Sequence, residues 1–208
     1  MKTDRILKIT QETDHKFLNF YTMRVRHRGG KESDYFMASR ASDITDLKAM
    51  GGNDRPDGVA IFAVYGPARD KVVLIRQFRY PLGDYIYEFP AGLMEEGEDM
   101  LGAAVREFYE ETGMALEPVD ADPMYMKPRY MTIGMTDESC ATVYGYTDGV
   151  PSNAAQEASE DITIVIADKA EVRRILQEEN VALLCAYQLM HFLSCDGDPL
   201  AFLEAGRQ

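Results

Sequence analysis

The sequence predicts an α/β fold in which a small antiparallel β-sheet precedes a larger domain of strands and helices. Strand-like segments occur in the first 40 residues, and from residue 59 onward they are interspersed with helical patterns. A chain of 208 residues with 46% hydrophobic content can also bury a real core. We place the boundary near Asp54, so that residues 1–53 form an N-terminal sheet region and residues 54–208 form the main domain.

The N-terminal region contains two extended-looking segments, Phe17 to His27 and Asp34 to Ser39. The turn-like sequence Arg28-Gly29-Gly30 lies between them and predicts an antiparallel pair. The segment from Ala41 to Pro56 is short, polar and contains glycine, which indicates a connector between the two regions.

The main domain is expected to contain strands that lead into an acidic helix, then further strands, then two C-terminal helices. The second C-terminal helix is mostly apolar, and we expect it to be buried. The expected strands are Val59–Tyr65, Lys71–Phe78, Tyr85–Phe89, Cys140–Thr147 and Ile162–Ala167, and the expected helices are Leu101–Thr112, Lys169–Glu179 and Val181–Cys195.

Charge and cysteine content restrict the class of function. The formal net charge of −13 argues against nucleic-acid binding, because a duplex binder needs a basic face. An anionic substrate would need local positive charge, which metal ions held by clustered carboxylates can supply. The three cysteines lack metal-ligand spacing and are expected to be reduced. No signal-peptide pattern or membrane-length apolar run is present, so we expect a soluble cytoplasmic protein.

The acidic helix can be interpreted from its spacing alone. Its buried stripe is expected to consist of Leu101, Ala104, Val105 and Phe108, with Gly113 ending the helix. Glu107 and Glu111 are four residues apart and should project together beside this stripe, where a divalent cation would remove their repulsion. Arg106 and Glu110 have the same spacing and can form an ion pair. The general alternative is a solvated acidic face.

The spacing of the surrounding residues favours the metal site over that alternative. The stretch fits the pattern G-x5-E-x7-R-E-U-x-E-E-x-G-U, where U is bulky and apolar. With seven fixed residue types at about 6% usage each, the chance of a match is on the order of 10⁻⁹ per start position. The matching residues are Gly92, Glu98, Arg106, Glu107, Phe108, Glu110, Glu111, Gly113 and Met114. This segment resembles the Nudix box of the Nudix hydrolase family.

The resemblance implies a Nudix α/β/α sandwich with a mixed sheet, in which a loop-helix-loop presents carboxylates to Mg²⁺, with Mn²⁺ as a possible substitute. By this resemblance Glu107, Glu111 and the carbonyl of Ala91 are metal ligands. The remaining box residues would support them: Gly92, Glu98, Arg106, Glu110 and Gly113.

Residues upstream of the box resemble one branch of the family. The run from Arg76 to Tyr80, followed by Glu88-Phe89-Pro90-Ala91-Gly92, is similar to the Q-x-R…E-x-P-A-G pattern of the ADP-ribose pyrophosphatases. The similarity implies that Arg79 contacts the substrate's phosphates or terminal sugar. Glu88 would orient a sugar hydroxyl or brace the loop, and Leu93 would also contact the substrate.

Two downstream loops resemble the same branch with departures. The segment Gly134 to Glu138 is similar to a substrate-binding loop, which makes Glu138 a substrate contact, although Thr132-Ile133 replace the expected Ser-Pro. The acidic segment Glu157 to Ile162 resembles the loop that supplies the catalytic base and another metal ligand. Glu160 matches the ligand, and either Glu160 or Glu157 would be the base. The loop from 147 to 159 has the composition of a mobile lid.

The resulting functional hypothesis is Mg²⁺-dependent hydrolysis of the pyrophosphate bond in a nucleoside diphosphate sugar, most specifically ADP-ribose to AMP and ribose 5-phosphate. A GDP- or UDP-sugar is the first alternative, and a non-catalytic Nudix-like ligand-binding module is the second. The resemblance also implies a homodimer formed through the N-terminal sheet, with no nucleic-acid or membrane partner.

Overall fold

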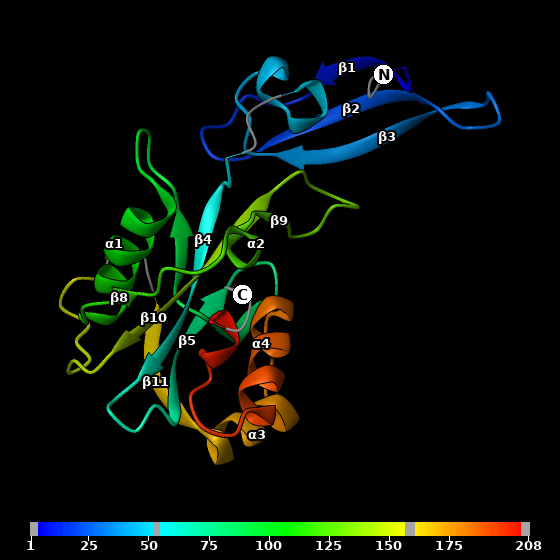
Figure 1. Ribbon diagram of the computed structural model, residues 1–208. Helices are drawn as coiled ribbons and strands as arrows, with labels where there is room; N and C mark the ends of the chain where they lie inside the picture. Colours follow the sequence, from blue (N-terminus) through cyan, green and yellow to red (C-terminus); the bar gives the residue numbers. More distant parts are fainter. Residues whose placement is uncertain (1–3, 52–54, 157–160, 205–208) are drawn as a thin grey trace. The chain divides into compact units, whose positions relative to one another are not determined.

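The computed structural model describes residues 4–51, 55–156 and 161–204 (Figure 1). The chain divides into two compact units, one made of residues 1–57 and 128–140 and the other of residues 58–127 and 141–208. The division falls at Asp57/Gly58, close to the boundary that the sequence suggested. The sequence did not indicate that residues 128–140 join the N-terminal unit.

The first unit is built on a three-stranded antiparallel sheet of β1 (Ile6–Gln11), β2 (Asn19–Arg26) and β3 (Glu32–Ser39). The predicted pair corresponds to β2 and β3, while β1 was not assigned as a strand. Tyr21, Met23 and Met37 are buried on one face of the sheet, together with Leu47 from the connector. That connector forms two short 3-10 turns, η1 (Ile44–Asp46) and η2 (Lys48–Met50).

Residues 128–140 belong to the first unit because they bond to β3 and to the end of the connector. The main-chain N–H of Ala38 donates to the carbonyl of Met135 at 2.9 Å, and that of Asp57 donates to Ser139 at 2.8 Å. Lys48 bonds both Asp57 and Ser139 through its ammonium group. A short strand, β9 (Arg129–Tyr130), pairs with Ser139 and Cys140.

The second unit is organised around a sheet with the strand order β11-β5-β4-β10-β8. Two short strands, β6 and β7, pair with β5 and β4. The N–H of Asp57 bonds Ser139 at one end of this strand pair, and the N–H of Gly66 bonds Thr147 at the other, so residue numbers rise in the same direction along both strands. Strands β4 and β10 are therefore parallel, and the sheet is mixed. The strands are β4 (Gly58–Tyr65), β5 (Lys71–Arg79), β6 (Asp84–Glu88), β7 (Ala91–Leu93), β8 (Glu117–Pro118), β10 (Ser139–Thr147) and β11 (Ile162–Asp168).

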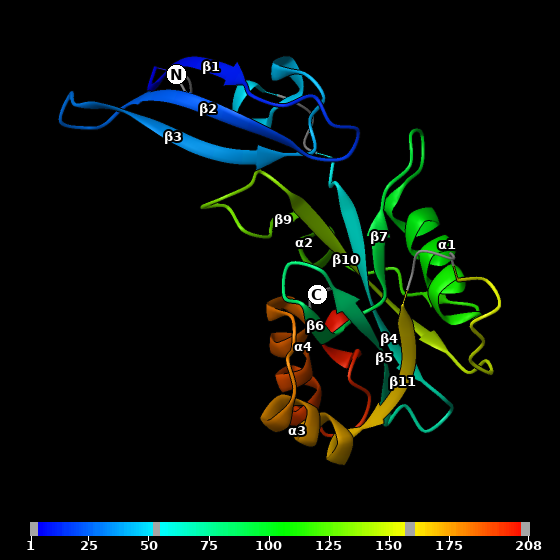
Figure 2. The same cartoon turned by 180° about the vertical axis from the view of Figure 1, so that it is seen from behind.

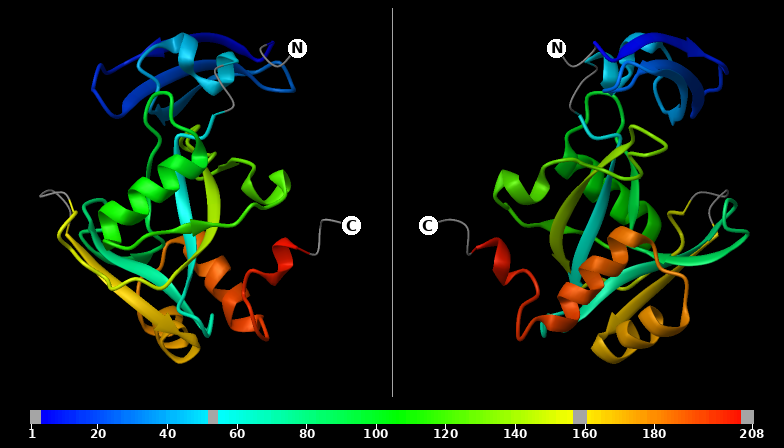
Figure 3. Two further views of the ribbon diagram at one scale, coloured as in Figure 1. Left: turned by 60° about the vertical axis from the view of Figure 1, so that its left-hand side comes forward. Right: turned by 90° about the vertical axis from the view of Figure 1, so that its right-hand side faces the viewer.

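Helices cover both faces of this sheet, as Figures 2 and 3 show. On one face α1 (Met100–Thr112) packs against β4 and β7, and on the other lie α3 (Lys169–Glu178) and α4 (Leu183–Ser194). The two short helical segments α2 (Pro123–Met126) and η3 (Ala201–Leu203) complete the unit. Residues of β4 are buried on both faces, because Ile61 contributes to the α1 core and Phe62 to the α3–α4 core. The expected α/β/α sandwich is confirmed.

Two predictions about helix faces were wrong. Leu101 and Val105 are each 39% exposed, so they lie outside the buried stripe of α1. The buried residues of that helix are Ala103, Ala104, Phe108, Glu111 and Thr112. Of these, Ala103, Ala104 and Phe108 pack in a core cluster with Val59, Ile61 and Ala63 of β4. Helix α4 buries only one side, through Cys185, Leu189 and Phe192, and exposes Leu183, Tyr187 and Met190.

All three cysteines are free thiols, as expected from their spacing. Burial raises the pKa of the Cys140 thiol to about 12, which leaves it a poor nucleophile. Within the described ranges, no helix is long and apolar enough to cross a membrane.

Candidate active site

The candidate site forms where α1 packs against β7. Strand β7 pairs with the start of β4, with Gly92 opposite Val59. Asp99 caps the N-terminus of α1 by accepting a hydrogen bond from Gly102 N at 2.7 Å, and Gly113 ends the helix in a left-handed conformation with φ of 69°. The length of α1 is therefore fixed at both ends, and its last two turns lie over β7.

Both carboxylates of the proposed metal pair meet this strand. The Glu107 carboxyl lies directly over Gly92, where a Cβ atom would be 1.9 Å from Glu107 Cδ. Any larger residue at that position would displace the Glu107 carboxyl. Glu111 is 3% exposed and accepts a hydrogen bond from the main-chain N–H of Ala91 at 3.0 Å. Glu111 therefore lies within the buried face of α1, whereas the sequence placed it beside that face.

Arg106 links the rest of the box. Its guanidinium pairs with Glu98 at 2.9 Å, with Glu107 at 2.9 Å and with Glu110 at 3.0 Å, and it donates to the carbonyl of Leu93 at 3.0 Å. The hydrogen bond to Glu98 is the main cause of the raised pKa of Arg106. The expected Arg106–Glu110 pair is confirmed. One permanently charged side chain thus joins the loop before α1 to the helix and orients Glu107.

Arg79 and Glu88 lie on the neighbouring hairpin of β5 and β6. The Arg79 guanidinium pairs with the Glu88 carboxylate at 2.7 Å. Since β6 leads through Phe89 and Pro90 into Ala91, this pair fixes Arg79 near the start of the box. The contact that the structure shows for Glu88 is this pair with Arg79.

A pocket of about 460 Å³ opens at the end of the same hairpin. The Tyr85 hydroxyl donates to Asp161 at 2.6 Å, a hydrogen bond that raises the pKa of Tyr85. The guanidinium of Arg76 stacks on the Tyr85 ring with 4.0 Å to the centroid. The pocket therefore combines aromatic surface with fixed charges. Its lining residues are Gln77, Phe78, Arg79, Tyr80, Pro81, Tyr85 and Asp161.

Of the remaining predicted site residues, one belongs to the first unit and two lie outside the described residues. Glu138 belongs to the first unit, where it pairs with Arg40 at 2.7 Å, a partner that the sequence did not suggest. Glu157 and Glu160 lie outside the described residues. Among the residues that are described, no group of three or more carboxylate, histidine or cysteine side chains could hold a metal ion. The box contributes two carboxylates and the Ala91–Gly92 main chain.

These contacts define an α/β/α protein whose loop-helix-loop motif presents paired carboxylates to a glycine-containing strand. The chain belongs to the Nudix family: residues 54–183 match the family described as NUDIX domain. A solved structure titled "Crystal structure of ADP compounds hydrolase" has the same fold, with a TM-score of 0.58 and 20% identity over 83% of this chain and 82% of that one.

Several curated relatives match parts of the chain. "Putative nudix hydrolase 2" of Caenorhabditis elegans is 33% identical over 55% of this chain and 52% of its own length. "ADP-sugar pyrophosphatase" of Mus musculus is 50% identical over 25% and 24%, and "ADP-ribose pyrophosphatase" of Saccharomyces cerevisiae is 30% identical over 55% and 48%. The chain thus spans at most about half the length of these relatives.

Proposed function

We propose that this protein hydrolyses the pyrophosphate bond of a nucleoside diphosphate sugar in a divalent-metal-dependent reaction, with ADP-ribose converted to AMP and ribose 5-phosphate. The observation that carries the proposal is the convergence of Glu107 and Glu111 on Ala91 and Gly92. A largely buried pair of like charges is costly unless a cation lies beside it. Arg106 is one such cation, and it pairs with Glu107.

The donor chemistry supports Mg²⁺, with Mn²⁺ as a substitute. We assign Glu107, Glu111, the carbonyl of Ala91 and Glu160 as ligands, all of which are hard oxygen donors. A metal ion bound there neutralises phosphate oxygens and lowers the pKa of a bound water. The base that removes a proton from the attacking water is assigned to Glu160, with Glu157 as the alternative.

The substrate is assigned to the hairpin side of the box. Arg79 carries a planar fork of donors suited to phosphate, and it lines the aromatic pocket at the end of β5 and β6. Glu88 limits its conformational freedom, so less entropy is lost when an anion binds. Leu93 is 42% exposed within the box, and we propose it, with Glu138, as a substrate contact.

The names of the mouse and yeast relatives support an ADP-ribose or ADP-sugar substrate. The same chemistry on a GDP- or UDP-sugar is the alternative, because Thr132 and Ile133 depart from the branch pattern and Ile133 is 63% exposed. A panel of the three nucleotide sugar classes, assayed side by side, distinguishes them by kcat/KM.

We also propose that the protein is a cytoplasmic homodimer. Its free cysteines suit a reducing compartment. Phe20 and Phe36 stack with ring centroids 6.0 Å apart on the exposed face of the N-terminal sheet, and an apolar face of this kind is typical of a protein contact. Light scattering after size exclusion should give twice the mass of the 23.4 kDa chain. A monomer mass at all concentrations would contradict the dimer.

Removal of the metal is expected to abolish the reaction. In excess EDTA, release of AMP from ADP-ribose should fall to background, because the carboxylates alone cannot stabilise negative charge on the phosphates. Readdition of Mg²⁺ or Mn²⁺ should restore the rate, as measured by chromatography of the products. Full hydrolysis in the chelator would contradict the mechanism, and hydrolysis of none of the nucleotide sugars with Mg²⁺ would favour the non-catalytic alternative.

A further inference from the structure

Three side chains form a row across the end of strand β5, in the pocket at the tip of the β5–β6 hairpin. Phe78 on β5 lies opposite Tyr85 on β6, and its N–H donates to the carbonyl of Asp161, which immediately precedes β11. The Tyr85 ring meets the Phe78 ring edge-on, with 5.4 Å between centroids. The Tyr85 hydroxyl donates to Asp161 Oδ2 at 2.6 Å, so a hydrogen bond closes the row over Phe78.

The row faces away from helix α1. Side chains of a strand alternate between the two faces of a sheet. On β5, Val72 and Leu74 belong to the α3–α4 core, whereas Val73 belongs to the α1 core. Phe78 is therefore on the same side as Leu74, and Arg79 follows on the side of α1. Because both Phe78 and Arg79 line the pocket, it reaches both faces of the hairpin.

The row presents a carboxylate acceptor beside aromatic surface. Asp161 is exposed, and its bond with Tyr85 uses one carboxylate oxygen, Oδ2, which leaves Oδ1 for a ligand. An ionised carboxylate only accepts hydrogen bonds, so the ligand group that it suits is a donor such as a hydroxyl. Tyr80 is 86% exposed and lies edge-on to Phe78, with 5.5 Å between centroids, which adds an apolar wall to the pocket.

The ring geometry favours a sugar over a nucleobase. A flat base binds by stacking on open aromatic faces. The Phe78 ring is nearly perpendicular to those of Tyr80 and Tyr85, with interplanar angles of 81° and 79°, so these three rings form no parallel slot. The guanidinium of Arg76 already covers a face of Tyr85, with 4.0 Å to the centroid. A sugar has apolar C–H groups and hydroxyl donors, which suit a lining of aromatic edges and a carboxylate.

We propose that this pocket binds the terminal sugar phosphate of the nucleotide sugar, and that Asp161 recognises the hydroxyls of that sugar. Arg79 takes the phosphate, and Asp161 Oδ1 accepts from adjacent hydroxyls of the ring. Tyr85 is a positioning residue, because its hydroxyl orients the carboxylate. The identity of the ligand rests on the proposed function, which yields ribose 5-phosphate from ADP-ribose. Ribose 5-phosphate is therefore the probe.

The test pairs a change in the protein with a change in the sugar. Ribose 5-phosphate, 2-deoxyribose 5-phosphate and AMP are each titrated into the full chain and followed by NMR. In Asp161→Leu the Kd of ribose 5-phosphate should rise by about 10- to 100-fold, the range for losing a hydrogen bond to a charged group. The wild type should bind the 2-deoxy sugar more weakly than ribose 5-phosphate, whereas Asp161→Leu should bind the two equally. The Kd of AMP should not change.

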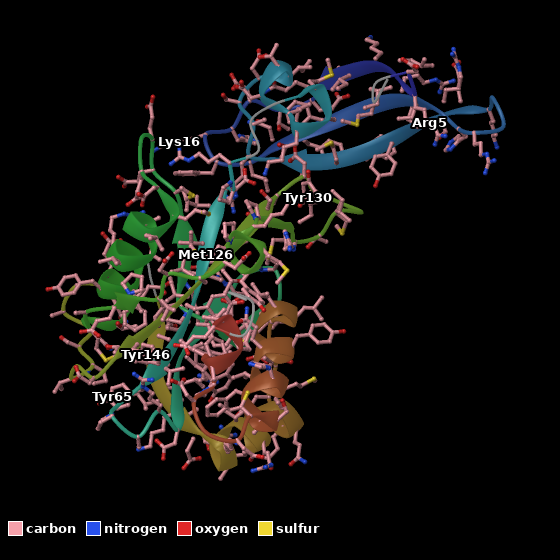
Figure 4. The ribbon with its side chains drawn as sticks, in the orientation of Figure 1. Arg5, Lys16, Tyr65, Met126, Tyr130 and Tyr146 are labelled. Carbon is pink, nitrogen blue, oxygen red and sulfur yellow. The ribbon has the colours of Figure 1, made fainter. Side chains whose placement is uncertain are left out.

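Two matched controls lie at the other end of β5. Tyr85→Phe removes the orienting hydroxyl and keeps the ring, so it should weaken ribose 5-phosphate by a smaller factor than Asp161→Leu. Tyr65→Phe is its control, because this hydroxyl bonds the carbonyl of Gly149 at 3.1 Å beside the first residue of β5, where Figure 4 labels it. Asp70→Leu changes an exposed aspartate directly before β5. Both controls should bind the sugar normally.

The binding data separate the two halves of the substrate. If Asp161→Leu weakens AMP and leaves ribose 5-phosphate unchanged, the pocket binds the nucleotide half and the sugar assignment is wrong. It is equally wrong if neither affinity changes, or if the wild type does not distinguish the two sugars. Should Asp161→Leu fail to fold, Tyr85→Phe with both sugars decides the question. A wild type that binds ribose 5-phosphate as expected but hydrolyses no nucleotide sugar would overturn the proposed function and leave the sugar site in place.

Discussion

Glu107→Gln and Glu111→Gln are each expected to lower kcat by more than about 100-fold. Losing an outer-shell partner of a metal ligand costs up to about 100-fold, and losing a ligand itself should cost more. Glutamine keeps the shape of the side chain and removes the charge that a divalent cation needs. Folding should be preserved. In Glu111→Gln the Tm should be unchanged or higher, because a neutral amide at a position 3% exposed costs less to bury than a carboxylate.

The comparison needs a charge-matched control. Glu96→Gln makes the same charge change at an exposed position of the loop before α1 and should leave kcat and Tm normal. Gly92→Ala should reproduce the loss without changing any charge, because the added methyl group would occupy the place of the Glu107 carboxyl. Near-normal kcat in both glutamine variants would contradict the metal assignment, and a low Tm in both would indicate a structural role instead.

The order of elements in the second unit could be predicted because its strands and helices carry local apolar patterns. Strands β4 and β5 are buried on both faces and appear as continuous apolar runs. The short strands β7, β8 and β9 have no such pattern, since two or three residues pair only because the neighbouring strands are already in place. Likewise, residues 128–140 join the first unit through main-chain hydrogen bonds that leave no periodic signal.

The candidate site was predictable where spacing on one helix determines geometry. Glu107 and Glu111 share a flank, and Arg106 reaches Glu110, because residues four apart are neighbours on a helix. The burial of Glu111 was not predictable, because it depends on the approach of β7, a strand that no sequence pattern indicated. Arg40 was missed for the same reason: its partner lies 98 residues away in the chain.

The second large effect is expected in the acidic segment. Glu160→Gln should lose far more activity than Glu157→Gln, with ADP-ribose still bound, because a base or ligand lost from this segment depresses turnover chiefly. We assign the base to the acidic segment because the resemblance places it there, whereas Glu107 and Glu111 are assigned to the metal alone. The described residues on either side are Gln156, whose amide donates to the carbonyl of Glu111, and Asp161, whose carbonyl accepts from the N–H of Phe78.

Steady-state kcat and KM for both variants, with ADP-ribose affinity measured by calorimetry, provide the measurement. Asp148→Asn, an exposed carboxylate in the loop directly after β10, is the charge-matched control and should have normal kcat. If Glu157→Gln loses most of its kcat while Glu160→Gln is normal, the base is assigned to Glu157. If both variants are normal, the base lies elsewhere, and the resemblance of residues 157–162 to the acidic loop of the pyrophosphatase branch does not extend to its chemistry.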